Sequence, residues 1–136
     1  MNKFDTLTKY IPLLEKDNLG TWSTDLEHHD ERSSGFPFVI YSVLINQFIR
    51  DVYEFQENNP DMELNVYQTI LEKHNIEWKL DSLINADHTL LDAQAIMALI
   101  LGSIRAERLN AGVLLEMLEN KCIEKWLKRL KQIDEL

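Results

Sequence analysis

The stretch from residue 93 to residue 104 constrains the fold more than any other part of the chain. Its sequence, AQAIMALILGSI, carries no charge and is apolar on nearly every side. A helix of this kind is stable only when other elements enclose it. We therefore expect residues 93 to 104 to form the central, most buried helix, to continue through Arg105-Ala106-Glu107-Arg108 and to end before Gly112.

Other segments repeat their apolar residues at the helical period of 3.6 residues. The clearest begins at residue 42 and should stop near Asn59-Pro60, because a residue before proline disfavours the helical conformation. Its apolar face consists of Leu44, Ile45, Phe48, Ile49, Val52 and Tyr53. Shorter helices are expected after residues 65, 112 and 121. Together the segments predict an all-α fold, an irregular bundle of five or six helices that forms one domain over residues 1 to 136.

The first part of the chain is less regular. Apolar residues at helical spacing, from Phe4 to Leu14, predict a first helix in which Pro12 either makes a kink or starts a new turn, and which Gly20 ends. Residues 18 to 41 contain a polar, turn-rich stretch followed by FPFVIY. Either a loop or a short hairpin fits this segment.

Charge and cysteine content exclude several classes of function. The chain has 14 basic and 23 acidic residues, a net charge of −9, which argues against sequence-independent binding to the phosphates of nucleic acid. No stretch approaches the ~18 apolar residues of a membrane span. The single cysteine, Cys122, allows no internal disulfide, which favours a reducing compartment. We expect a cytoplasmic protein that binds neither nucleic acid nor membranes.

The candidate catalytic and metal-binding residues are scattered. His28-His29-Asp30-Glu31 is the densest cluster, but adjacent side chains point apart, so the sequence predicts no metal site and no cofactor. Cys122 has no histidine near it in sequence to activate it. Acidic edges at Asp51, Glu54 and Glu57, with Glu116 and Glu119 further along, match the carboxylate spacing that holds magnesium against phosphates. They support one alternative, a metal-dependent hydrolase of phosphorylated small molecules.

Polar residues are most concentrated at Arg105, Glu107 and Arg108. These charges continue directly from the most apolar helix, and a charge drawn inward there must be paired or hydrogen-bonded. Arg105 and Arg108 share a helix face, whereas Glu107 points towards another element. We expect the three to pack with Trp22 and Tyr41 of the irregular segment. They form either a structural ion-pair network or a site where an arginine binds a carboxylate or phosphate.

Several motifs resemble a family of small bacterial proteins that is catalogued as a domain of unknown function. The motifs that carry the resemblance are Gly20-Thr21-Trp22, Phe36-Pro37-Phe38-Val39-Ile40-Tyr41, Arg105-Ala106-Glu107-Arg108 with Gly112, and Leu127 with Leu130. The resemblance implies a helical domain and no particular activity.

No motif in the sequence indicates a catalytic site, such as a glycine-rich phosphate loop or a nucleophile elbow. By elimination we expect a non-enzymatic binding or regulatory domain. It should recognise a protein or a small ligand, either as a monomer or as a homodimer.

Overall fold

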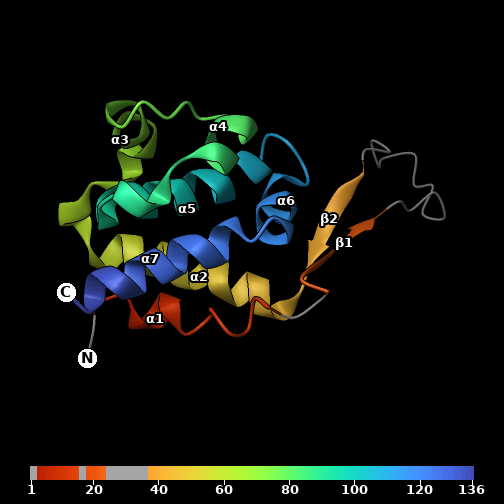
Figure 1. Cartoon of the computed structure of the whole chain (residues 1–136). Coiled ribbons are helices and arrows are strands. Elements are labelled where there is room, and N and C mark those ends of the chain that lie inside the picture. Colours follow the sequence, from red (N-terminus) through yellow and green to blue (C-terminus); the bar gives the residue numbers. More distant parts are fainter. Residues whose placement is uncertain (1–2, 16–17, 24–36) are drawn as a thin grey trace.

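The computed structural model describes residues 3–15, 18–23 and 37–136. Most of these residues are helical, which confirms the predicted all-α class (Figure 1). The elements are α1 (Asp5–Thr8), β1 (Gly20–Ser23), β2 (Phe38–Tyr41), α2 (Val43–Asn58), η1 (Pro60–Met62), η2 (Leu64–Val66), α3 (Tyr67–Lys73), α4 (Leu80–Asn85), η3 (His88–Leu90), α5 (Ala93–Glu107), α6 (Val113–Glu119) and α7 (Cys122–Asp134), where η denotes a 3-10 helix.

Helix α5 is the centre of the bundle, as predicted. Every residue from 95 to 104 is buried, and α3, α6 and α7 pack directly against the helix. The Asp92 carboxylate caps its first turn by accepting the amide of Ala95 at 2.9 Å. The helix ends at Glu107, before Gly112, so its last turn lies where the polar cluster was predicted.

The first segment departs from its prediction. Helix α1 ends at Thr8, and Gly20 begins a strand instead of ending a helix. Pro12 explains the early end, because a proline ring clashes with the carbonyl four residues before it, here that of Thr8. The segment continues in turns, and its apolar side chains still reach the core.

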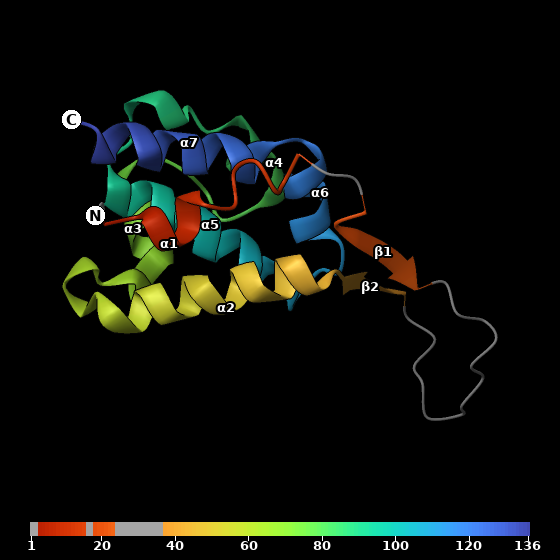
Figure 2. The ribbon, with the colours of Figure 1, turned by 90° about the horizontal axis from the view of Figure 1, so that it is seen from below.

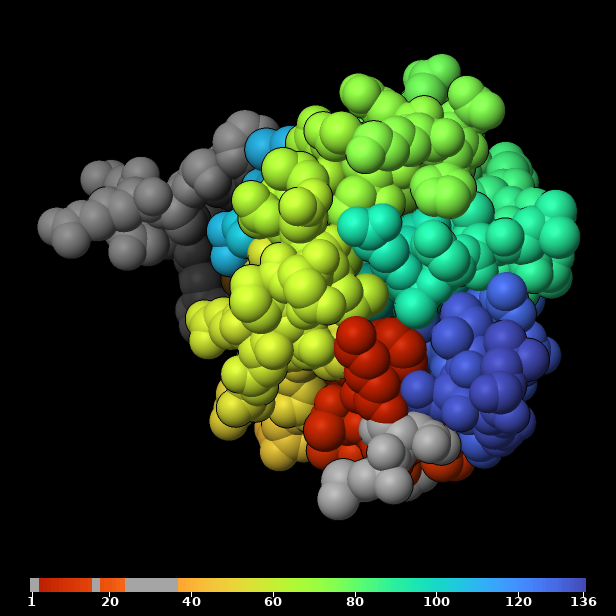
Figure 3. All heavy atoms as spheres, turned by 90° about the vertical axis from the view of Figure 1, so that its left-hand side faces the viewer, coloured from red at the N-terminus to blue at the C-terminus, as the bar shows by residue number. Residues whose placement is uncertain are grey.

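The two ends of the described chain lie side by side. Helix α1 lies between α2 and α7 (Figure 2), and the amide of Phe4 donates to Asp134 Oδ2 at 3.0 Å. A space-filling view shows the N-terminal residues against the end of α7 (Figure 3). The bundle is thus closed by contacts between residues that are far apart in sequence.

Residues 18 to 41 contain a hairpin, one of the two alternatives. β1 and β2 pair antiparallel, with Gly20 opposite Tyr41 and Ser23 opposite Phe38. The hairpin extends from the bundle near α6 (Figure 1). Ser42 follows β2 and caps α2, since its hydroxyl accepts the amide of Ile45 at 3.2 Å. The hairpin is therefore joined to α2 with no intervening loop.

Tyr10 gives this fold an alkaline pH dependence. Its hydroxyl donates to Asp51 Oδ2 at 2.6 Å, and burial together with the Asp51 charge raises the pKa of Tyr10 to about 12. Between about pH 10 and pH 12 the unfolded chain loses this proton while the folded chain keeps it, so stability falls across that window. In urea unfolding at both ends of the window, wild type should lose more stability than Tyr10→Phe. Equal losses would contradict this assignment.

Among the described residues, no helix has the length and apolar character needed to cross a membrane.

Candidate anion-binding pocket

The structure divides the five predicted site residues into two groups. Glu107 lies with Tyr41 and Trp22 where the hairpin meets α6, whereas Arg105 and Arg108 line a pocket against α2. Glu107 and the two arginines all lie at the end of α5, yet they face different ways, because side chains one or two positions apart on a helix do not share a face.

The Glu107 carboxylate holds the start of α6. It accepts the amide of Gly112 at 3.0 Å and that of Leu114 at 2.9 Å. These amides belong to the first turn of a helix, where backbone donors have no partner within the helix. Glu107 therefore acts as a capping residue for α6, although it lies in the preceding helix.

The hairpin is fixed to the same carboxylate. Tyr41 is hydrogen-bonded to Glu107, and its hydroxyl accepts the amide of Leu115 at 3.0 Å. Burial, the hydrogen bond to Glu107 and the charge of that carboxylate raise the pKa of Tyr41 well above its ordinary value. Trp22 covers Gly112 so closely that a Cβ there would lie 2.3 Å from the indole ring. Glu107 is therefore hydrogen-bonded to Tyr41 and to the amide of Gly112, the residue that Trp22 covers.

The two arginines belong to a different environment. Arg105 lies over the ring of Tyr53, with 5.2 Å from Cζ to the ring centroid. No ion pair involves Arg105 or Arg108 in the part of the chain that the structure describes. These arginines are therefore outside the hydrogen-bonded network that fixes the hairpin.

Two buried polar atoms at this place have no hydrogen-bond partner, Arg105 Nε and Tyr53 Oη. A buried donor without a partner costs ~1–3 kcal/mol, so folded proteins satisfy nearly all of them. Both atoms belong to facing side chains, so one group with acceptor oxygens could satisfy both.

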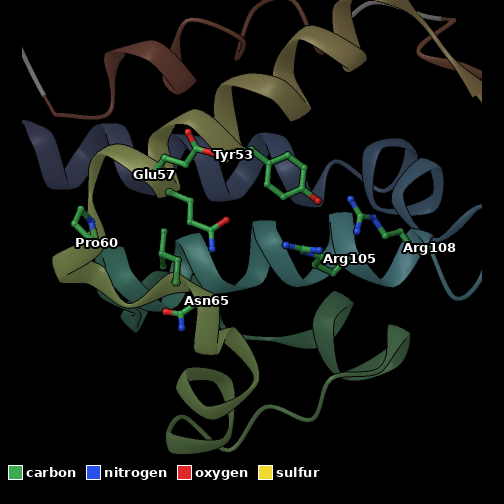
Figure 4. Close-up of a pocket in the computed structure, with 8 residues that line it drawn as sticks. Tyr53, Glu57, Pro60, Asn65, Arg105 and Arg108 are labelled. Atoms are coloured by element: carbon green, nitrogen blue, oxygen red, sulfur yellow. The ribbon is translucent and has the colours of Figure 1, made fainter.

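The atoms lie beside a pocket of about 570 Å³. Its walls come from α2, from η1 and η2, and from the last turn of α5, through Tyr53, Gln56, Glu57, Pro60, Leu64, Asn65, Arg105 and Arg108. The Tyr53 hydroxyl and the two guanidinium groups approach one another from opposite walls (Figure 4). Arg108 is exposed and lines the same pocket.

Sequence reasoning missed Tyr53 as a site residue. Tyr53 belongs to the apolar stripe of α2, and only the approach of α5 shows that its hydroxyl faces two arginines. Glu57 was considered as part of an acidic edge, whereas in the structure it lines the arginine pocket. One sequence signal pointed to Tyr53 as a site residue. It is a tyrosine in an apolar stripe whose other members carry no side-chain polar atom, so its hydroxyl needs a hydrogen-bond partner.

The described residues give the hydrolase alternative no additional support. Asp51 is engaged by Tyr10 and by Lys9, whose Nζ lies 3.5 Å from its carboxylate. Within residues 3–15, 18–23 and 37–136, no three histidine, cysteine or acidic side chains gather as metal ligands. Burial raises the pKa of the Cys122 thiol, which disfavours the nucleophilic thiolate. His28-His29-Asp30-Glu31 lies outside the described residues.

A second pocket, of about 360 Å³, lies beside Trp78 and is lined by Glu72 and Glu77. Neither carboxylate is among the buried unpartnered groups. The arginine pocket thus has the stronger evidence for a ligand.

Comparisons with protein-family models, with curated proteins and with solved structures gave no match.

Proposed function

We propose that this chain is a non-enzymatic binding domain for a small ligand with an anionic group, which Arg105, Arg108 and Tyr53 recognise. The observation that carries the proposal is the pair of buried, unpartnered donors beside the pocket, Arg105 Nε and Tyr53 Oη. A carboxylate or phosphate supplies acceptor oxygens for both. Proteins that bind ligands often keep such strained or unsatisfied groups, because the bound ligand supplies the hydrogen bonds that they lack.

The residues suit this ligand chemically. A guanidinium group presents a planar set of donors that matches two oxygens of a carboxylate or phosphate. Stacking on Tyr53 orders Arg105 before the ligand arrives, which reduces the entropy lost on binding. The carbonyl end of α5 repels anions, so the two arginine charges must supply the attraction.

The rest of the molecule limits the ligand to small anions. A net charge of −9 repels polyanions at long range, whereas a small anion interacts mainly with the nearby arginines. The volume of about 570 Å³ is within the range of small-molecule sites. The pocket therefore favours a metabolite-sized ligand over a nucleic acid.

Substitutions at Arg105 and Tyr53 test the proposal because they separate binding from stability. Arg105→Met retains the packing over Tyr53, and Tyr53→Phe removes only the hydroxyl. Both variants should keep or exceed the wild-type melting temperature, since each removes an unsatisfied buried group. Each should also weaken anion binding roughly 10- to 100-fold, the effect of losing a hydrogen bond to a charged group.

The binding measurement is a thermal-shift and calorimetric titration with inorganic phosphate, ethyl phosphate and butyrate at low ionic strength. Arg50→Met is the matched control, because Arg50 is an exposed arginine of α2 that does not line the pocket. Anion binding that is equal in wild type and Arg105→Met would refute the proposal. So would a complete lack of binding by wild type.

Location and assembly are proposed on sequence grounds alone. We propose a cytoplasmic protein, as the single cysteine favours, and membership of the bacterial family that its motifs resemble. A homodimer stays a prediction, and sedimentation equilibrium would test it.

A further inference from the structure

The charges in the pocket are arranged along its length. Glu57 lies four residues after Tyr53, one turn further along α2, which places its Cα ~6 Å further along the helix axis. In Figure 4 Glu57 lies on the side of Tyr53 nearer Pro60, and Arg108 lies on the opposite side. The pocket therefore has an acidic end and a basic end.

These opposite charges do not neutralise each other. None of the ion pairs found among the described residues includes Glu57, Arg105 or Arg108. A ligand with a single negative group would satisfy the arginines and leave the rest of the ligand near Glu57, an exposed residue that lines the same pocket. A ligand with a positive group at its other end would satisfy both ends.

We infer that the ligand is a small zwitterion. Its carboxylate or phosphate binds at Arg105, Arg108 and Tyr53, and its protonated amine binds at Glu57. The Gln56 and Asn65 amides also line the pocket and can donate or accept hydrogen bonds between the two ends. This inference rests on the proposed anion site and adds to it the second recognition group and the ligand class.

The arrangement also explains which anions the pocket rejects. Glu57 repels a second negative group, so diacids and compounds with several phosphates bind less well than molecules of the same length that carry an amine. Because Glu57 and Arg105 belong to different helices, α2 and α5, the distance between the two ligand charges should matter as well.

Matched ligand pairs test the inference. Phosphoethanolamine is compared with ethyl phosphate, and 4-aminobutyrate with butyrate, so that each pair differs only by the amine. In wild type the amine should increase affinity at least about 10-fold, the contribution of one charge-assisted contact. A series of ω-amino acids of increasing length locates the optimal distance between the two ligand charges. Comparison of the phosphate pair with the carboxylate pair identifies the preferred anionic group.

Glu57→Gln should remove the preference for the amine, while its affinity for ethyl phosphate or butyrate should equal or exceed that of wild type, because a nearby negative charge is lost. Glu54→Gln is the control, since Glu54 lies on the same helix, is exposed and does not line the pocket. Equal binding within each wild-type pair, or an amine preference that survives Glu57→Gln, would overturn the zwitterion and leave the anion site standing. If no member of either pair binds wild type, the anion site fails and the zwitterion with it.

Discussion

Replacing Glu107 with alanine should lower the free energy of unfolding by about 3 kcal/mol or more. The carboxylate accepts the amides of Gly112 and Leu114 and a hydrogen bond from Tyr41, and alanine leaves all three donors without a partner. The first turn of α6 and the base of the hairpin should both loosen. Urea unfolding followed by far-ultraviolet circular dichroism measures the loss.

Glu116→Ala is the matched control, because Glu116 is exposed on α6 and its loss should change stability by less than about 0.5 kcal/mol. Glu107→Gln should fall between the two, since an amide oxygen still accepts hydrogen bonds without the negative charge. If Glu107→Ala is as stable as Glu116→Ala, Glu107 does not hold the hairpin and α6 together.

Replacing Gly112 with alanine should destabilise the fold by about 2 to 4 kcal/mol, combining two effects. Gly112 has a φ of 97°, a left-handed conformation that costs a side-chain-bearing residue ~1–2 kcal/mol. The added methyl group would also lie 2.3 Å from Trp22 Cζ2, so the indole and its strand must move. Thermal unfolding gives the total effect.

A double-mutant cycle separates the two effects. In a Trp22→Ala background the steric part disappears, and Gly112→Ala should then cost only the conformational part. An equal cost of Gly112→Ala in both backgrounds would show that Trp22 does not pack on Gly112 in solution.

Periodicity correctly predicted the helices that bury either one face or their whole surface. α2 ends at Asn58, next to the predicted stop at Asn59-Pro60, and α5 is as buried as its composition requires. The first segment was predicted wrongly because its apolar spacing fits turns as well as a helix. The hairpin could not be chosen over a loop, because its strands are short and depend on contacts with α6 through Tyr41 and Trp22.

Only part of the candidate site could be predicted from the sequence, because the rest depends on how the helices pack. Sequence placed Arg105, Glu107 and Arg108 at the end of the apolar helix and gave Glu107 a separate direction. It could not show that Glu107 caps a later helix or that the arginines face Tyr53, because both facts depend on how α2 and α6 pack around α5. Partners far apart in sequence leave no local pattern.

In the proposed site, Arg105 Nε–H donates a hydrogen bond to the anionic group of the ligand. Nitrogen-15 NMR of the arginine Nε–H groups tests it directly, with phosphoethanolamine, ethyl phosphate, 4-aminobutyrate and butyrate as probes and Arg105→Met and Arg50→Met to assign the signals. We predict that the Arg105 Nε–H signal shifts downfield and saturates with the same affinity as the thermal stabilisation, while the Arg50 signal stays unchanged. An Arg105 signal that does not move while a probe stabilises the protein would contradict the account, and so would the absence of any response to all four probes.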